Sequence, residues 1–383
     1  MVFAKHGRSF LGSWWWTIDR LTLVAVVIII AFSAIMVTTA SPAVADRIGV
    51  GSYYFVKRQL VFLILSILII TFFSFCSTDS IKKISALGFL FFGFLMLLTL
   101  IYGVEIKGAR RWIGIGSFSL QPSEFIKPFF AVITGWILSK RYSSRDFPAF
   151  RIAILLYLVI IILLFLQPDF GMIVTISCVW GGQLFLAGLS ISWILALIIT
   201  GIFGVTIAYV VLPHVAQRIN SFLDPSLSEN YQIKKSISAF INGGMFGKGP
   251  GEGTVKQFLP DSHTDFIFAV VGEELGVVTC LLVIALFMFI VIRGFIRISN
   301  QTDLFSAYSV AGLLMLFGIQ SIVNMGVTVH LLPTKGMTLP FISYGGSSIF
   351  AVSILIGIIL ALTKKKFGHK YKFKYRKLPK HDG

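Results

Sequence analysis

The chain has 383 residues, of which 56% are hydrophobic and 13% are charged, with a formal net charge of +17. A soluble globular domain carries roughly 25% charged residues, and the mean hydropathy here is +0.88. This composition excludes a single soluble core and a disordered chain. The three cysteines, Cys76, Cys178 and Cys280, lie in separate apolar runs, so they predict neither a disulfide framework nor a zinc site.

Apolar segments recur along the whole chain. A bilayer core about 30 Å thick needs roughly 20 apolar residues per helix, and ten segments are candidates. In chain order they lie near residues 21–40, 59–77, 84–103, 125–139, 152–167, 171–188, 190–212, 265–292, 305–325 and 345–363. The uncharged stretch 170–217 must hold two of them, with a turn at residues 188–190. The sequence therefore predicts an all-α polytopic membrane protein of about ten transmembrane helices, with one transmembrane domain over residues 1–363.

Basic residues are divided unevenly between the two sides of this predicted bundle. The side that carries both termini has 20 Lys and Arg, against 13 on the other side. Because cytoplasmic loops are enriched in Lys and Arg, both termini are predicted to be cytoplasmic. Residues 213–264 then form one large extracytoplasmic loop between helices seven and eight. The basic tail 364–383 is predicted to contact membrane lipids rather than nucleic acid.

Three basic residues gather on the outer face, where the positive-inside rule disfavours them. They are Lys107, Arg110 and Arg111. Solvated loop charges are one interpretation. A site for an anion is the other, because guanidinium forks suit phosphate oxygens. Trp112 follows directly, either as an interfacial anchor or as the wall of a sugar subsite.

Charged residues also enter the predicted helices. Glu124 and Lys127 are three positions apart, so they can pair across one helical turn, either as a structural ion pair or as part of a functional site. Asp265 is predicted to open the eighth helix, where simple helix capping is the alternative to chemistry. Glu273 would then lie about 12 Å deeper, and with Glu274 it predicts a polar groove that enters the membrane from outside.

A glycine-rich stretch, residues 242–253, precedes these acids. It is not a nucleotide-binding P-loop, because Asn242 replaces the first glycine and Gly249 follows Lys248 where Ser or Thr is needed. Its backbone amides could still cradle a pyrophosphate. The histidines show no zinc-binding spacing.

Five motifs in order resemble the SEDS family (shape, elongation, division and sporulation). They are KGARRWI (107–113), QPSEFIKP (121–128), YQIKKSISAFINGGMFGKG (231–249), FLPDSHTDFIFAVVGEELG (258–276) and LPTKGMTLPFISYGGSS (332–348). The resemblance runs from the first predicted helix to the tenth. The PTKG form at residues 333–336 is more similar to the division branch of the family than to the elongation branch.

The resemblance implies a peptidoglycan glycosyltransferase that polymerises lipid II on the outer face of the bacterial inner membrane, at the division septum. It implies that Asp265 is catalytic. The substrate-binding residues it implies are Trp112, Arg110, Arg111, Glu124, Lys127, His263, Lys335 and Ser343. The implied partners are a cognate class B penicillin-binding protein and other division proteins. No cofactor is certain, and a divalent cation, Mg²⁺ or Mn²⁺, is left open; Gln257 stands where some division-type members have a carboxylate.

The chemistry agrees with this resemblance. Inverting sugar transfer needs a base for the acceptor hydroxyl, which we assign to Asp265, and cations or a metal for the departing pyrophosphate. Three alternatives remain open at this stage. One is a lipid II flippase, to which Glu273 and Glu274 would lend intramembrane charge. The others are a non-catalytic scaffold for a transpeptidase and an elongation-type polymerase.

Overall fold

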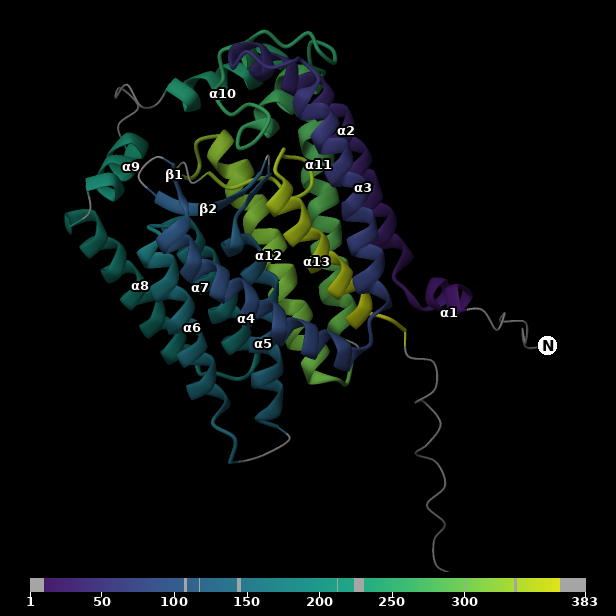
Figure 1. The fold of residues 1–383 in the computed structure, drawn as a ribbon, viewed down its shortest axis with the longest axis vertical. Coiled ribbons are helices and arrows are strands. Elements are labelled where there is room, and N and C mark those ends of the chain that lie inside the picture. Colours follow the sequence, from purple (N-terminus) through teal and green to yellow (C-terminus); the bar gives the residue numbers. More distant parts are fainter. Residues whose placement is uncertain are drawn as a thin grey trace, which may run out of the picture.

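The computed structural model describes residues 10–106, 109–116, 118–142, 146–211, 213–223, 231–299, 301–333 and 336–365. Its elements are arranged in Figure 1 as a bundle of helices with a small sheet near one end. In chain order they are α1 (Phe10–Thr17), α2 (Arg20–Arg47), α3 (Tyr54–Phe75), α4 (Thr78–Tyr102), β1 (Val104–Ile106), β2 (Ala109–Ile115), β3 (Phe118–Leu120), α5 (Pro122–Lys140), α6 (Ala149–Leu166), α7 (Phe170–Leu186), α8 (Ile191–Val211), α9 (Pro213–Leu223), α10 (Tyr231–Gly243), the 3₁₀ turn η2 (Val255–Gln257), α11 (Ile267–Ser299), α12 (Leu304–Thr328) and α13 (Gly346–Leu362).

Each of the ten predicted apolar segments coincides with one helix, namely α2 to α8 and α11 to α13. Within the described residues, seven helices are long and apolar enough to cross a membrane: α2, α3, α4, α6, α8, α11 and α12. Helices α7 and α13 are apolar but only 17 residues long. The chain is thus a multi-pass membrane protein, whereas the count of ten spans and their orientation remain predictions.

The all-α prediction misses a small antiparallel sheet of order β1-β2-β3 between α4 and α5. It was missed because β1 and β3 have only three residues each, too few for an alternating pattern to stand out. The sheet, α10 and the segment 244–266 lie at one end of the bundle, toward the top of Figure 1. We call this end the loop end. The predicted outer loop 213–264 contains α9, α10 and η2.

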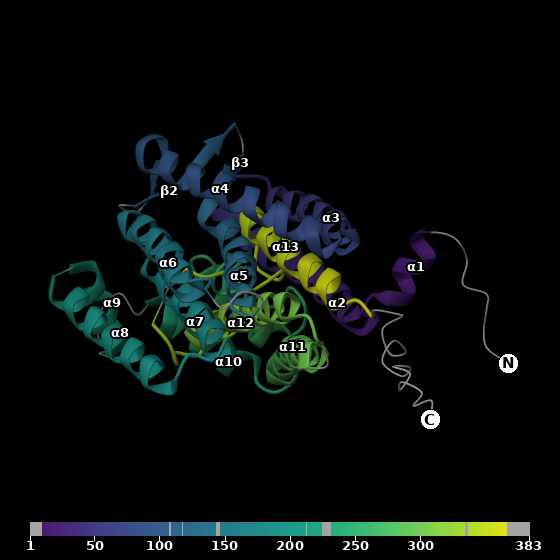
Figure 2. The same cartoon turned by 90° about the horizontal axis from the view of Figure 1, so that it is seen from below.

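Helices α5 and α12 form the centre of the bundle and are buried along most of their length. Their backbones approach closely at Gly135, where an added Cβ would lie 2.6 Å from the backbone nitrogen of Ser309. Small residues permit such contacts between membrane helices. By contrast, α8 and α9 lie at the periphery in Figure 2, and the predicted turn before α8 is confirmed at Gly188, with φ of +86°.

Helix α11 is interrupted at Gly276, whose φ of 80° and ψ of 173° are not helical. The glycine-rich segment that follows α10 packs into this break. Gly249 N donates to Glu274 O at 2.9 Å, and Val277 N donates to Gly244 O at 3.0 Å. A Cβ at Gly276 would lie 2.3 Å from Met245 O, so only glycine fits there. Residues 244–249 therefore complete the hydrogen bonding that the break removes from α11.

Candidate functional site

Asp265 lies in a turn before α11, at the base of the loop end. The helix begins at Ile267, so the prediction that Asp265 opens it is wrong by two residues. The turn is closed by Thr264 N and Phe266 N, which donate to Asp261 O at 3.1 and 3.2 Å. Asp265 is partly buried. Its side chain is therefore held by a turn rather than by the regular backbone of a helix.

Two neighbouring segments fix this turn. The amide of Asn324 on α12 donates to Asp265 O at 2.9 Å and to Met337 O at 2.6 Å. A Cβ at Gly336 would lie 3.4 Å from Asp265 Oδ2, so the carboxylate lies against the glycine of the PTKG motif. The Ser343 hydroxyl donates to Thr264 O at 2.6 Å and also accepts from Leu339 N. The predicted site residues Asp265 and Ser343 are thus brought together.

His263 is buried two residues before Asp265, between the rings of Phe55 and Tyr344, whose centroids lie 4.7 and 5.3 Å away. Its carbonyl accepts from Tyr344 N at 2.8 Å. Burial lowers the pKa of His263 to about 4, against a smaller rise caused by Asp261. The imidazole is therefore neutral at physiological pH and packs as an aromatic ring.

Glu124 and Lys127 form a buried ion pair at the start of α5. Lys127 Nζ lies 2.9 Å from Glu124 Oε2, and the two side chains are 2% and 11% exposed. Lys127 also donates to Gln320 Oε1 at 3.2 Å. The Gln320 amide in turn donates to Thr338 O at 3.1 Å, one residue from the contact of Met337 with Asn324. The ion pair and Asp265 therefore belong to one polar network that crosses α12.

Three further predicted residues, Arg110, Arg111 and Trp112, lie on β2. Arg110 pairs with Glu105 at 3.3 Å, and both side chains are about half exposed. Arg111 donates to Gln167 O at 3.0 Å and to Pro168 O, and lies 3.5 Å from Asp169. It therefore ties the sheet to the α6–α7 connection.

Trp112 is half-buried on β2, opposite Val104 on β1. The sheet is joined to the start of α13 through Ser347, whose hydroxyl donates to Ser119 O on β3 at 3.3 Å and accepts from Gln121 N at 3.0 Å. Lys335 and Lys107 lie outside the described residues.

Glu273 and Glu274 do not provide charge to a groove. Glu273 is fully buried and accepts from the Asn242 amide and from the backbone nitrogens of Thr254, Val255 and Lys256, at 2.8 to 3.2 Å. Glu274 Oε1 lies 2.5 Å from Lys256 Nζ. The backbone nitrogens on this carboxylate directly follow the stretch 242–253 that was expected to cradle a pyrophosphate. Within that stretch, Lys248 N and Gly249 N donate to the backbone oxygens of Glu273 and Glu274. We call the arrangement around the Glu273 carboxylate the Glu273 nest.

The predicted depth of these acids is also wrong. The lysine that pairs with the second acid, Lys256, donates to Thr39 O on α2 at 3.0 Å. Ser343, which binds the Asp265 turn, belongs to a segment that also contacts α2. There the Ser33 hydroxyl donates to Phe341 O at 2.7 Å. Ser33 is about 9 Å farther from the loop end than Thr39, at 1.5 Å per residue. Asp265 therefore lies farther from the loop end than Glu273 and Glu274 do. The first residues of α11 run toward the loop end, so the two acids lie nearer to it.

Sequence reasoning missed Gln320 and Asn324, which belong to the polar network that crosses α12. It also missed Lys256, which pairs with Glu274 beside the Glu273 nest. Gln320 and Asn324 stand four residues apart in the uncharged run 304–334, so their shared helix face was the available signal. No group of three or more His, Cys, Asp or Glu in the described ranges is placed to hold a metal ion.

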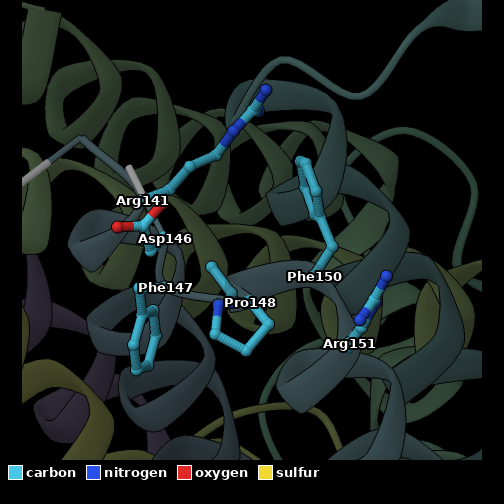
Figure 3. A pocket seen from close by; sticks show the side chains of 7 residues that line it. Arg141, Asp146, Phe147, Pro148, Phe150 and Arg151 are labelled. Carbon is cyan, nitrogen blue, oxygen red and sulfur yellow. The ribbon is translucent and has the colours of Figure 1, made fainter. Parts of the chain in front are cut away.

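A cavity of about 350 Å³ lies at the far end of α5 from Glu124, lined by Arg141 and residues 146–151. Figure 3 shows its side chains. It does not include any of the predicted site residues.

Comparisons with known proteins agree with this arrangement. Residues 19–367 match the family model of the cell cycle proteins named for FtsW, RodA and SpoVE. The probable peptidoglycan glycosyltransferase FtsW of Caulobacter vibrioides is 38% identical over 96% of this chain and 94% of its own length. The corresponding protein of Coxiella burnetii is 37% identical over 91% of this chain and 96% of its own length.

Solved structures show the same fold. A chain described under "structural coordination of polymerization and crosslinking by a peptidoglycan synthase complex" aligns with a TM-score of 0.75 and 26% identity, over 90% of this chain and 97% of its own. The rod shape determining protein RodA of Thermus thermophilus aligns with a TM-score of 0.68 and 26% identity, over 91% and 97%. The chain therefore belongs to the SEDS family of cell cycle proteins and is a glycosyltransferase of the FtsW type.

Proposed function

We propose that this enzyme polymerises lipid II, the undecaprenyl-pyrophosphate-linked disaccharide-peptide, into glycan strands at the outer face of the inner membrane during division. The observation that carries the proposal is the position of Asp265. Its carboxylate lies against Gly336, and its backbone is held by Asn324. The relatives named as peptidoglycan glycosyltransferases support the same chemistry.

In the proposed step, Asp265 removes the proton of the acceptor sugar hydroxyl as that oxygen attacks the anomeric carbon of the donor. The bond from this carbon to the pyrophosphate oxygen breaks, and the pyrophosphate leaves on its lipid with the bonding electron pair. The attack comes from the face opposite the leaving group, so the configuration inverts. A pyrophosphate needs no strong acid, but its developing charge needs positive groups.

Among the predicted cations, Arg110 is best suited to contact the pyrophosphate. Its pair with Glu105 is half exposed, and such surface pairs contribute about 0–1 kcal/mol, so the guanidinium can exchange partners at little cost. Arg111 already donates to two carbonyls. Lys127 is buried with Glu124 and acts on the site through Gln320. Trp112, beside Arg110 on β2, would then border the sugar.

A divalent cation is a separate part of the proposal. The described residues hold no cluster that would bind Mg²⁺ or Mn²⁺, so we derive no step through a metal held by the protein. Mg²⁺ can be bound by one carboxylate together with substrate phosphates, which would require the ion to arrive with the pyrophosphate. Chelation by EDTA, followed by return of Mg²⁺ or Mn²⁺, measures whether polymerisation depends on such an ion.

The transport alternative loses its main support, because Glu273 and Glu274 are engaged by donors of the same chain. We further propose that the enzyme works at the septum with a class B penicillin-binding protein. The similarity to a chain of a peptidoglycan synthase complex supports this pairing.

The decisive experiment is polymerisation of lipid II by the purified protein, with and without this partner, analysed by gel separation of the glycan strands. Wild type is expected to produce strands, whereas Asp265→Ala and Asp265→Asn are not, although both reach the membrane in normal amounts. Asn matches Asp in size, so near-normal turnover by Asp265→Asn would contradict the role of Asp265 as a base.

A further inference from the structure

Two carboxamide side chains on successive turns of α12 connect the segments that carry the proposed site. Gln320 and Asn324 are four residues apart, so they lie on the same face of the helix. Each is 2% exposed. A buried amide must find partners for its polar atoms or cost free energy. The partners of these two amides are therefore a guide to what they do.

Asn324 uses both N–H bonds of its amide on backbone carbonyls, at Asp265 O and Met337 O. A carbonyl oxygen can only accept, so the orientation of the amide is fixed by its partners. Asn324 Oδ1 has no partner among the described residues. This side chain is thus committed to joining the turn before α11 to the segment before α13.

These two segments carry the groups that lie against each other at the proposed catalytic carboxylate. Gly336, which precedes Met337, would place a Cβ 3.4 Å from Asp265 Oδ2. Two other hydrogen bonds join the same segments, from Ser343 Oγ to Thr264 O and from Tyr344 N to His263 O, and neither is made to Asp265 itself. The amide of Asn324 donates directly to the backbone oxygen of Asp265.

Building on the proposed role of Asp265 as base, we propose that Asn324 is a positioning residue for this reaction. It fixes the backbone of Asp265 relative to the 336–338 segment, and so fixes the carboxylate relative to the acceptor hydroxyl. A displacement of about 1 Å in a catalytic group can reduce the rate about a hundredfold. Loss of Asn324 should therefore reduce kcat and leave KM unchanged, since the substrate contacts proposed above lie elsewhere.

The bundle contains a matched control for the purely structural alternative. Gln183 on α7 is fully buried and also donates two hydrogen bonds to carbonyls, at Ala131 O (2.8 Å) and Tyr308 O (3.0 Å). Its Oε1, like Asn324 Oδ1, has no partner among the described residues. It joins α5, α7 and α12 but contacts no proposed site residue. Asn324 and Gln183 therefore provide the same kind of brace at different places.

The test compares Asn324→Leu, Gln183→Leu and Asp265→Asn in the full-length protein with its partner, by melting temperature and by kcat and KM for lipid II. We expect both leucine variants to melt at lower temperatures. Asn324→Leu should lose about a hundredfold in kcat with KM within about twofold, as expected for a misplaced group. Gln183→Leu should keep kcat within about threefold below its melting temperature. If Asn324→Leu does not fold, Asn324→Ser keeps one donor and should show an intermediate loss of kcat.

Several outcomes would overturn the proposal. Equal kcat for the Asn324 and Gln183 variants would make Asn324 an ordinary structural brace, as would a change confined to KM. If Asp265→Asn is inactive while Asn324→Leu or Asn324→Ser turns over normally, only the positioning role fails. If Asp265→Asn retains turnover, the base assignment fails, and with it the role of Asn324.

Discussion

The Glu273 nest holds residues 254–256 against α11, and a single substitution of Glu273 tests how strongly it does so. Glu273 Oε1 accepts from Asn242 Nδ2, Thr254 N and Val255 N, each at 2.8 Å, and Oε2 accepts from Lys256 N at 3.2 Å. The substitution Glu273→Gln keeps the size of the side chain. It removes the charge and places an NH₂ group where one oxygen must accept.

The free energy that Glu273→Gln removes from the closure of the loop can be estimated from these contacts. A hydrogen bond to a charged group contributes about 1.5–3 kcal/mol and a neutral one about 1 kcal/mol, so three bonds weaken by roughly 1 kcal/mol each. The fourth is lost, because the NH₂ group of Gln would face the N–H of Lys256, and an unsatisfied buried donor costs about 1–3 kcal/mol. Glu273→Gln should therefore weaken the closure of the loop by about 4–6 kcal/mol.

Trypsin reports this opening directly, because Lys256 is buried while the loop is closed. Cleavage after Lys256 in Glu273→Gln, in detergent or nanodiscs, should be far faster than in wild type, with fragments identified by mass spectrometry. Glu252→Gln is the matched control, since Glu252 is exposed in the same loop. If both variants are cleaved at the wild-type rate, the nest does not hold the loop and the reasoning fails.

Three further changes test other contacts. Lys127→Met should lower stability by about 3–5 kcal/mol, because it leaves the buried Glu124 carboxylate without its ion-pair partner; an unchanged melting temperature would contradict a buried pair. Arg111→Lys should lower the melting temperature more than Arg110→Lys, because a lysine cannot make the forked contacts of Arg111, and equal effects would count against that difference. His263 has a pKa of about 4 in the folded protein against 6.5 normally, so only the unfolded chain gains this proton as pH falls from about 6.5 to 4. The contribution of His263 to stability is therefore fully present above pH 6.5, and the free energy of unfolding decreases by up to about 3 kcal/mol toward pH 4. Melting curves of His263→Asn should lack this part of the pH dependence, and a slope identical to wild type would refute it.

The helices were predictable from the sequence because each apolar segment is long, uncharged and bounded by polar residues. The motifs also identified Asp265 and Ser343, which the structure brings together. The direction of the segment that begins α11 was not predictable. It depends on a break at Gly276 whose missing hydrogen bonds are supplied by residues near Gly249, about thirty positions earlier.

The hydropathy of the sequence also did not predict the polar network. Asn324 is one of two amides in the uncharged run 304–334, and its partners are backbone carbonyls, which carry no sequence signal. Arg111 was interpreted as an anion ligand because its charge lies on a disfavoured face. The structure uses it on the α6–α7 connection, a contact between residues about 56 positions apart that local patterns do not reveal.

The pairing of residues 244–256 with α11 limits how the length of this loop can vary. Surface loops usually tolerate insertions at small entropic cost. Here Gly249 N is bonded to Glu274 O and Thr254 N to the Glu273 carboxylate, so the four residues between them must close a fixed gap. An added or deleted residue would shift one of these bonds out of register. A glycine-rich and partly exposed connection, which composition alone would mark as freely variable, is therefore expected to keep a constant number of residues.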